Sequence, residues 1–269
     1  MQTPEILGII AGNGVYPKIL AAAARTAGVK KIVAAAFTDE TDPAISEHVD
    51  VVEWLRVGQL GRLLKFFREH KVNRAIMAGQ IAPKNLFDLR PDVKALVVLA
   101  KLKQRNAESI FTAIADELAK ADVHLLPATT FLENDLAAKG LVAGPKLARS
   151  EEEDVDLGWN VAKEIARLDI GQTVIVKNGT VLAVEAFEGT NDAIKRGGAL
   201  AREGAVMIKV AKPNQDMRFD VPVVGIETIK VAADANLRVI AVEAGKTLLL
   251  ERDKVVDLAE RSKMSLVAR

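Results

Sequence analysis

Short apolar runs alternate with amphipathic segments along the first half of the chain. The runs at 6–11 and 31–37 are apolar or glycine at nearly every position, which is typical of parallel strands that are buried on both faces. Between them, residues 17–27 have helical periodicity, begin with a proline and end before Gly28, as helices often do. The chain therefore begins with a predicted strand–helix–strand unit.

The same alternation continues to about residue 133. It predicts strands at 49–55, 74–77 and 123–125 and helices at 58–70, 92–103 and 108–121. A regular alternation of this kind indicates a parallel sheet wrapped by helices. We therefore expect a Rossmann-like α/β domain over residues 1–133.

A second α/β domain is predicted over residues 134–269. Between 133 and 150, Gly140, Gly144 and Pro145 stand among few periodic apolar positions, which indicates a linker and a boundary near Asn134. Beyond it, strands at 173–176 and 181–186 flank Asn178-Gly179, the dipeptide that best fits a type I′ hairpin turn. The remaining prediction is helices at 151–168, 192–203, 227–235 and 254–261, strands at 205–210, 238–242 and 247–250, and a loop to 222.

Composition excludes several classes of protein. The chain has 269 residues, 49% of them hydrophobic, and a formal net charge of +1, which disfavours a nucleic-acid binder. It has no cysteine, so disulfides, thiolate nucleophiles and sulfur-ligated metals are excluded. The longest apolar candidate, 95–100, is six residues, against the roughly 20 that a bilayer requires. No signal-peptide pattern is visible at the N-terminus, so a cytoplasmic protein is expected.

The residue types and their spacing also exclude several enzyme mechanisms. The three histidines lack metal-ligand spacing, which argues against a zinc site or a histidine base. No serine lies in a G-x-S-x-G context, so a serine hydrolase is not expected. Water is the better candidate for a nucleophile.

Two glycine-containing turns follow predicted strands of the first domain. Gly12, Asn13 and Gly14 come directly after the first strand, and Gly79 and Gln80 follow the strand at 74–77. Both turns open on the same edge of a parallel sheet, where nucleotides and phosphates bind. The spacing is neither the dinucleotide fingerprint nor a P-loop, so simple connecting turns without a ligand are the alternative.

Carboxylates border a predicted strand end in the second domain. Glu185 and Glu188 flank the end of the strand at 181–186, and Thr190 or Asn191 caps the following helix. Two carboxylates beside a helix N-terminus suit a metal held against phosphate. The alternative is that the carboxylates are solvated and that Thr190 only caps the helix.

The loop after the strand at 205–210 is densely charged. Phosphoryl transfer from a pyrophosphate explains such a mixture, because cations neutralise phosphate oxygens, one carboxylate holds Mg²⁺ and another orients water. An exposed, solvated turn is the alternative. Asp220 lies between the apolar residues Phe219 and Val221, so simple solvation explains this carboxylate less well than it explains Asp216. The charged residues of this stretch are Lys209, Lys212, Asp216, Arg218 and Asp220.

Seven motifs, taken in order and with their spacing, resemble the UDP-2,3-diacylglucosamine pyrophosphatases of lipid A biosynthesis, the LpxI family. The resemblance runs the length of the chain. The motifs are GIIAGNGVYP at 8–17, AG at 78–79, LRPD at 89–92, LLPATTFL at 125–132, AVEAFEGTNDAI at 183–194, KVAKPNQDMRFDVPVVG at 209–225 and AVEAGKTLLL at 241–250.

The resemblance implies an activity and a general arrangement. Two α/β domains would hold the substrate in the cleft between them. Hydrolysis of UDP-2,3-diacylglucosamine at the α-phosphorus would give UMP and 2,3-diacylglucosamine 1-phosphate, with Mg²⁺ as the cofactor. A homodimer and transient contact with the inner face of the inner membrane are further implications.

The resemblance also implies roles for single residues. Asp220 falls at the family's essential carboxylate, so it would bind metal or activate water, and Glu188 would be a second metal ligand. Lys212 would stabilise charge on the pyrophosphate, beside Thr190. The glycine turns at 12–14 and 79–80 would hold the uridine diphosphate portion, and the substrate contacts would include Lys209 and Arg218.

Two departures from the family pattern limit what can be carried over. Ala107 stands where the family has an acidic residue, and the loop at 82–84 lacks the usual arginines. The acyl chains of such a substrate need an apolar groove. The helix around 96–102 and Phe131 are candidates for its walls, and ordinary core packing is the alternative for both.

Two other functions remain open. A nicotinamide-dependent oxidoreductase acting on a nucleotide sugar fits the strand–helix–strand start, although no acidic residue closes the strand at 31–37. A non-catalytic module that binds UDP-lipids also fits charges clustered at strand ends.

Overall fold

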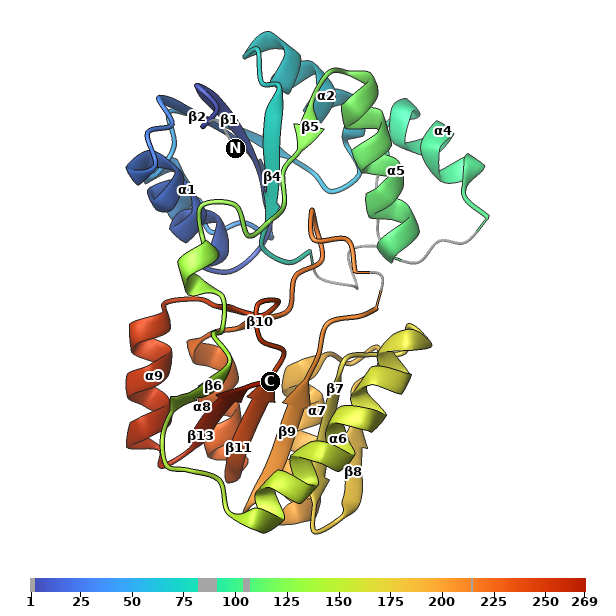
Figure 1. Ribbon diagram of the computed structural model, residues 1–269. Coiled ribbons are helices and arrows are strands. Elements are labelled where there is room, and N and C mark those ends of the chain that lie inside the picture. Colours follow the sequence, from blue (N-terminus) through green and yellow to red (C-terminus); the bar gives the residue numbers. More distant parts are fainter. Residues whose placement is uncertain (1–2, 82–90, 104–106, 214) are drawn as a thin grey trace. The chain divides into compact units, whose positions relative to one another are not determined.

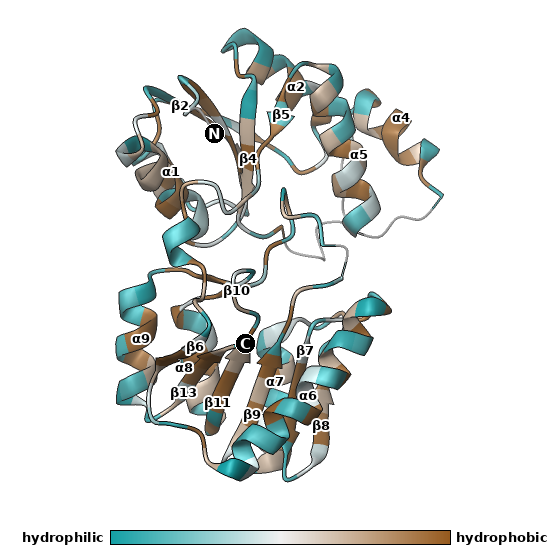
Figure 2. Ribbon diagram, in the orientation of Figure 1, coloured by the Kyte–Doolittle hydropathy of each residue, from teal (hydrophilic) through white to brown (hydrophobic). Residues whose placement is uncertain are grey.

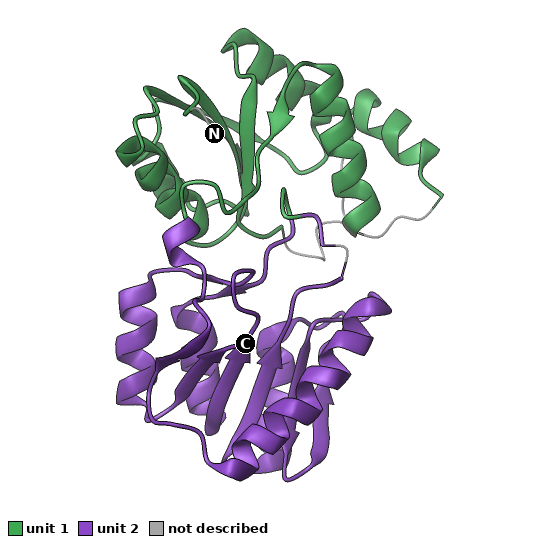
Figure 3. Cartoon of the chain, viewed as in Figure 1, with its two compact units in different colours: residues 1–132, 217–219 green, residues 133–216, 220–269 purple. Residues whose placement is uncertain are grey.

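The computed structural model describes residues 3–81, 91–103, 107–213 and 215–269, without the side chain of residue 107. The chain forms two compact α/β units (Figure 3). The N-terminal unit comprises Met1–Leu132 and Met217–Phe219, and the C-terminal unit comprises Glu133–Asp216 and Asp220–Arg269. Four positions of the sequence motifs and of the loop at 82–84 lie outside the described residues: Lys84, Leu89, Arg90 and Asn214.

The N-terminal unit contains a five-stranded sheet in the order β3-β2-β1-β4-β5 (Figure 1). Every neighbouring pair is parallel, and this is the strand order of Rossmann-like folds. The predicted parallel sheet is therefore confirmed. The strands are β1 (Ile6–Ala11), β2 (Lys31–Phe37), β3 (Val51–Leu55), β4 (Arg74–Ala78) and β5 (His124–Leu125).

Helices cover both faces of this sheet because successive strand residues point to opposite sides. Val33 and Ala35 face a core that includes Leu63 and Phe67 of α2 (Leu60–Glu69) and Leu118 of α5 (Ala107–Lys120). On the other face, α1 (Tyr16–Thr26) contacts β1 and β4. A further helix of this unit is α4 (Val93–Lys101), and a short 3-10 helix spans Pro43–Glu47.

The C-terminal unit contains a six-stranded mixed sheet in the order β6-β13-β11-β9-β7-β8. The central strand β11 is parallel to β9 and β13, whereas β7 pairs antiparallel with both β9 and β8. The strands are β6 (Gly140–Ala143), β7 (Thr173–Lys177), β8 (Thr180–Val184), β9 (Ala205–Lys209), β11 (Leu237–Val242) and β13 (Ser265–Ala268), and β10 (Val223–Val224) with β12 (Leu248–Leu249) forms a separate parallel pair.

Alternation along these strands builds one core on each face. Val174 and Val176 of β7 pack toward α6 (Arg149–Arg167), whereas Ile175 packs toward the opposite layer. That layer is formed by α7 (Thr190–Ala201), α8 (Ile226–Asp234) and α9 (Arg252–Arg261). Figure 2 shows the apolar strands lying between helices that carry polar residues. The prediction of two α/β domains is confirmed.

The predicted hairpin is also confirmed. Asn178 and Gly179 have φ values of 49° and 71°, as a type I′ turn requires at both central positions. The buried carboxylate of Asp154 on α6 accepts hydrogen bonds from both backbone amides, at 2.8 and 2.7 Å. This contact fixes the turn against α6.

The region expected to be a linker contains structure that the sequence pattern did not reveal. After a 3-10 turn at Glu133–Asp135, β6 pairs antiparallel with β13 at the sheet edge. Neither strand was predicted. β6 has four residues, begins with Gly140 at φ 119° and leaves Leu141 48% exposed, so it lacks the alternation that identifies a strand.

The loop between β9 and β10 was expected to be one irregular segment, but its middle belongs to the N-terminal unit. There the amide of Ala128 donates to the carbonyl of Met217 at 2.7 Å. Phe219 stacks on Phe111 of α5 with ring centroids 5.6 Å apart. Asp220, the next residue, is already part of the C-terminal unit.

Among the described residues, no helix combines the length and apolarity needed to cross a bilayer.

Candidate functional site

The glycine turns of the N-terminal unit lie where its strand order reverses. β1 and β4 are adjacent, and the connections that follow them lead to opposite sides of the sheet. Such a switch point is the usual place for a ligand in an open α/β sheet. The turn at 12–14 follows β1 and the turn at 79–80 follows β4, so the expectation that both open on one edge is confirmed.

These two turns contact each other through their backbones. The amide of Gly12 donates to the carbonyl of Ala78, and the amide of Asn13 donates to that of Gln80, each at 2.7 Å. The amide of Gln80 donates back to Asn13 at 3.3 Å. Ligand contacts at this edge therefore require groups other than these three amides, such as the exposed side chains of Asn13 and Gln80.

Close backbone approach explains why two of the positions are glycine. A Cβ atom on Gly12 would lie 2.7 Å from the carbonyl carbon of Gly79, and one on Gly79 would lie 2.5 Å from the carbonyl oxygen of Asn13. Gly79 also has φ 90°, where side chains are strained. The glycines thus have a structural role whether or not a ligand binds.

We expect Gly79→Ala to destabilise the protein by about 2–3 kcal/mol, because it adds a backbone clash to a strained φ. Gly14→Ala is the matched control, since Gly14 has φ 89° but no atom within 4 Å of its would-be Cβ. The control is expected to cost only about 1 kcal/mol. Urea unfolding of both variants measures the difference, and equal losses would contradict the role of close approach.

The C-terminal unit gathers polar side chains at one edge of its sheet. Because β7 runs antiparallel to β9 and β8, its first residue lies beside the last residues of both neighbours. Thr173 pairs with Lys209 at the end of β9. The amide of Glu185, just past β8, donates to the carbonyl of Thr173 at 2.8 Å. The sheet register therefore brings Thr173, Lys209 and Glu185 together.

A hydroxyl connects the two charged members of this edge. Thr190, at the start of α7, donates from Oγ1 to Glu185 Oε1 at 2.7 Å and accepts from Lys209 Nζ at 2.8 Å. Glu185 and Lys209 are each only 7% exposed. A buried cation and a buried carboxylate thus share one hydroxyl that satisfies both.

Burial lowers the pKa of Lys209, because it penalises the charged ammonium. The negative charges of Glu185 and Asp220 act in the opposite direction and raise it. Asp220 is therefore close enough to Lys209 to contribute to the electrostatics of this buried amine.

Lys212 connects Asp220 to a further carboxylate. Its Nζ forms an ion pair with Asp169, just after α6, and lies 4.0 Å from Asp220 Oδ2. The amide of Asp220 donates to the carbonyl of Asp216 at 2.9 Å, which orients this part of the loop. The structure thus brings four of the predicted site residues to one edge of the sheet: Thr190, Lys209, Lys212 and Asp220. We call these four residues, together with Glu185 and Asp169, the charged edge.

Glu188 and Arg218 have other neighbours. Glu188 is paired with Arg196 at 2.5 Å, which lowers the pKa of its carboxyl, and its second oxygen accepts from the amide of Ala186 at 3.1 Å. Arg218 lies over the ring of Phe219 in the N-terminal unit, 5.9 Å from the centroid. Their roles in metal and substrate binding stay predictions.

The described residues provide no ready-made set of three or more histidine or carboxylate ligands for a metal. Mg²⁺ does not require one, because it is commonly held by one or two carboxylates together with substrate phosphates. Asp220 is 40% exposed and has the oxygen ligands that Mg²⁺ prefers. It fits such a shared site better than Glu188, both of whose oxygens are engaged.

One residue of the charged edge, Asp169, was missing from the sequence analysis. Glu185 was a candidate there because it stands at the end of a predicted strand, but the roles implied by the family resemblance went to Glu188. Asp169 had no signal in the local sequence, because its partner Lys212 is 43 residues away.

Two buried amide atoms beside the charged edge, Gln172 Oε1 and Gln215 Nε2, have no hydrogen-bond partner among the residues that the structure describes. The amide of Gln172 donates to Glu185 Oε2 at 3.3 Å, and Gln215 Oε1 accepts from the amide of Lys212 at 2.7 Å. Buried polar atoms are costly to leave unpaired.

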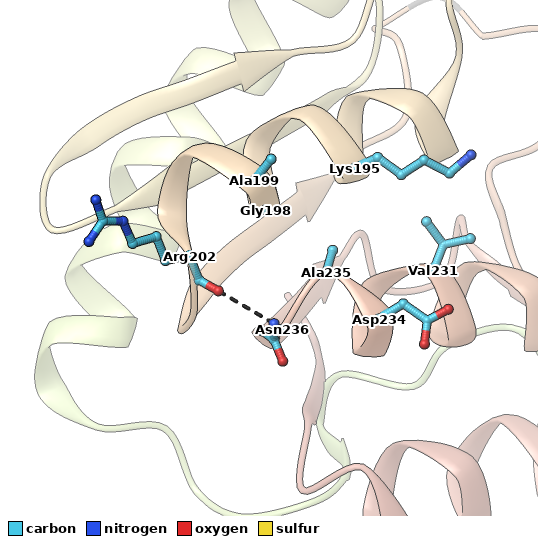
Figure 4. Close-up of a pocket in the computed structure, with 8 residues that line it drawn as sticks. All are labelled: Lys195, Gly198, Ala199, Arg202, Val231, Asp234, Ala235 and Asn236. Atoms are coloured by element: carbon cyan, nitrogen blue, oxygen red, sulfur yellow. Dashed lines mark hydrogen bonds between the residues drawn. The ribbon is translucent and has the colours of Figure 1, made fainter.

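A shallow cavity of about 460 Å³ lies elsewhere on the C-terminal unit (Figure 4). Its lining comes from the C-terminal part of α7 and the end of α8, and it includes Lys195, Arg202 and Asn236. Thr190 stands at the opposite end of α7. The cavity is therefore separate from the charged edge.

The candidate walls for acyl chains have different surroundings. On α4, Leu96 is 53% exposed, which ordinary core packing does not explain. Phe131 is partly buried and has φ 71°. The side chain of Ala107 and the loop at 82–84 lie outside the described residues.

We expect Thr190→Val to lower kcat/KM by about 10- to 100-fold, because it leaves a buried ammonium and carboxylate without the group that satisfies both. Thr190→Ser keeps the hydroxyl and is the matched control. Steady-state kinetics with a pyrophosphate substrate measure the effect. An equal loss in both variants would show that the methyl group, and not the hydroxyl, matters.

Comparison with known proteins gives one consistent result over both units. The model of the LpxI N-terminal domain matches residues 6–134, and the model of the LpxI C-terminal domain matches residues 138–267. A curated relative, the UDP-2,3-diacylglucosamine pyrophosphatase LpxI of Caulobacter vibrioides (strain ATCC 19089 / CIP 103742 / CB 15), is 31% identical over 267 residues. The match covers 94% of each chain.

Proposed function

Because the chain belongs to the LpxI family over nearly its whole length, we propose that it hydrolyses the pyrophosphate of UDP-2,3-diacylglucosamine in lipid A biosynthesis. The observation that carries the proposal is the charged edge, where two lysines and a carboxylate come together at one sheet edge. Such a combination suits phosphoryl transfer to water.

The proposed reaction is attack of water on the α-phosphorus. The new bond joins the water oxygen to that phosphorus, and the bond to the bridging oxygen breaks. The products are UMP and 2,3-diacylglucosamine 1-phosphate. The leaving group is a phosphate that is already anionic, so its departure places more demand on charge stabilisation than on a general acid.

Each residue of the charged edge has a corresponding role. Asp220 has one of two roles: it holds the Mg²⁺, or it orients the attacking water and accepts its proton. Lys212, 4.0 Å from Asp220, stabilises charge on the phosphate oxygens. Lys209 is held in place by Thr190 and contributes a second positive charge. A buried lysine keeps its position without reorganisation when charge develops, which favours the transition state.

Mg²⁺ is the proposed cofactor, held by Asp220 and by oxygens of the pyrophosphate. When bound it would neutralise charge on the phosphates. Glu188 remains a second candidate ligand, although its pairing with Arg196 would first have to be broken.

The uridine diphosphate portion is proposed to bind at the turns formed by Gly12, Asn13 and Gly14 and by Gly79 and Gln80. Support comes from the strand order, which places these turns at a switch point. Arg218 is proposed as a further substrate contact. Cytoplasmic location, a homodimer and transient contact with the inner membrane surface accompany the proposal as expectations.

The two alternative functions predict different results. A nicotinamide-dependent oxidoreductase would bind a dinucleotide, and a UDP-lipid-binding module would retain the lipid without releasing UMP. Neither alternative function needs a carboxylate close to Lys212 and within electrostatic range of Lys209.

Incubation of the purified protein with UDP-2,3-diacylglucosamine, with and without Mg²⁺, tests the proposal. We expect UMP and 2,3-diacylglucosamine 1-phosphate to appear in equal amounts and to depend on the metal. Bound but uncleaved substrate would support the binding module instead. Cleavage without added metal, and in the presence of EDTA, would contradict the cofactor but not the reaction.

A further inference from the structure

A buried carboxylate outside the charged edge holds the chain between two of its lysines. Glu243 comes directly after β11, and the sheet register pairs Val242, the last residue of β11, with Lys209 at the end of β9. The two strands are parallel, so their carboxyl ends lie at the same edge of the sheet. Glu243 is only 9% exposed, and the proposed reaction gives this carboxylate no role.

The contacts of Glu243 converge on the backbone of Ala211. Glu243 Oε2 accepts from the amide of Ala211 at 2.8 Å and also from the ammonium of Lys163 on α6. The same ammonium donates to the carbonyl of Ala211 at 3.3 Å. The amide and the carbonyl belong to successive peptide planes, so this ion pair restrains both backbone dihedral angles of Ala211. We call Glu243 and Lys163 the Ala211 clamp.

The clamp lies between the two cations that the proposed reaction uses. Lys209 is two residues before Ala211, and Lys212 is the next residue after it. Lys209 is buried in the sheet and held by Thr190, whereas Lys212 stands in the loop, with its ammonium 4.0 Å from Asp220. The backbone angles of Ala211 set the direction in which the chain leaves β9, so they set the position of Lys212 relative to Lys209.

The charge of Glu243 is maintained although the side chain is buried. Burial by itself raises the pKa of its carboxyl, but the hydrogen bonds from Lys163, from Lys246 at 2.9 Å and from the Ala211 amide together lower it. The carboxylate is therefore charged at neutral pH. Well-packed apolar residues often stabilise a fold as well as a buried ion pair does, so stability alone is a weak reason for this one.

We propose that Glu243 and Lys163 are positioning residues for the hydrolysis, which act by fixing the distance of Lys212 from Lys209 where the two cations meet the pyrophosphate. The inference rests on the proposed function. Charged groups stabilise a transition state best when they are in place before the charge develops, and a displacement of about 1 Å can cost about 10²-fold in rate. Loss of the clamp is therefore expected to lower kcat more than substrate affinity.

Glu243→Met tests this role, because it nearly keeps the volume of the side chain and removes both the charge and the acceptor. We expect kcat for release of UMP from UDP-2,3-diacylglucosamine to fall about 30-fold, with KM changed by less than about threefold. Glu243→Gln keeps an oxygen that can accept from the Ala211 amide. It should recover kcat to within about fivefold of the unmodified protein.

Glu117→Met is the matched control. Glu117 is also 9% exposed and also pairs with two lysines, Lys94 and Lys120, at 2.5 and 2.7 Å. It lies on α5 in the N-terminal unit, whereas every residue of the charged edge belongs to the C-terminal unit. Its kcat should stay within about twofold of that of the unmodified protein, with all variants assayed well below their unfolding midpoints.

A double-variant cycle with Lys212→Ala separates positioning from a general effect on the fold. Without the lysine that the clamp positions, Glu243→Met should lower kcat by less than about threefold further. Lys163→Met provides a second route if Glu243→Met does not fold, because the side chain of Lys163 is 32% exposed. It removes the other half of the clamp and should lower kcat about tenfold.

The outcomes separate the inference from the proposed function. The inference is overturned, and the pyrophosphatase stands, if Glu243→Met costs as much in the Lys212→Ala protein as in the unmodified one. It is overturned as well if Glu117→Met lowers kcat equally, or if KM rises while kcat is unchanged. If the unmodified protein releases no UMP, the proposed function fails, and the positioning role fails with it.

Discussion

Asp220→Asn is expected to lower kcat for hydrolysis of UDP-2,3-diacylglucosamine by about 10³-fold, as expected for loss of a residue that activates the nucleophile. The asparagine amide cannot accept a proton from water at neutral pH, and it removes the negative charge near Lys212 and Lys209. Substrate affinity measured without Mg²⁺ should change little, because Lys209 and Lys212 remain. Initial rates of UMP release, with substrate affinity measured separately, provide the values.

The fold should tolerate this substitution. Asp220 is 40% exposed, and the hydrogen bond that its backbone amide donates to Asp216 is unaffected. Asp192→Asn is the control, since Asp192 is 61% exposed and pairs with Lys195 on the surface of α7. Activity of Asp220→Asn within a few-fold of the unmodified protein, at an unchanged unfolding midpoint, would remove Asp220 from the chemistry.

Lys209→Met is expected to reduce both activity and stability. Without the ammonium, the buried carboxylate of Glu185 keeps a charge whose partners among the described residues include the Thr190 hydroxyl and the backbone amide of Gln172. Removing one member of a buried charge pair commonly costs about 3–5 kcal/mol. We expect a loss of about 3 kcal/mol in the free energy of unfolding and about a 10²-fold loss in kcat/KM. Urea unfolding and steady-state kinetics measure the two effects.

A double variant separates the two consequences. Lys209→Met/Glu185→Gln removes both buried charges and nearly preserves shape, so it should recover most of the lost stability. Activity should stay low, because the positive charge is still absent. Recovery of activity together with stability would mean that Lys209 acts only on the fold, and stability losses that simply add would contradict the pairing with Glu185.

The elements of the N-terminal unit could be predicted from the sequence because its strands are buried on both faces. β1 and β2 are short apolar runs bounded by Gly12 and Gly28, and the helix between them begins near Pro17. Parallel strands are usually connected through a helix, so local patterns indicate the order of elements. The edges of the C-terminal sheet lack such patterns, and β6 and β13 pair antiparallel across more than a hundred residues.

Part of the candidate site could be predicted as well, because some of its features are local in the sequence. Chemical character and strand ends are visible in a sequence, so Thr190, Lys209, Lys212 and Asp220 could be selected from their types and positions. The partner of each charge is not visible, because ion pairs form between residues that are far apart along the chain. Glu188 pairs with Arg196, whereas Glu185, three residues earlier, lies at the charged edge.

The sequence by itself determined the two α/β units, the strand ends at which polar residues stand, and the glycine positions where two turns approach each other. Only the tertiary structure decided which carboxylate joins Lys209. A strand places alternate side chains on opposite faces, and the antiparallel register of β7 with β8 and β9 then selects the positions that meet. Glu185 is adjacent to Thr173 in that register, and the hydroxyl of Thr190, at the start of α7, connects Glu185 to Lys209.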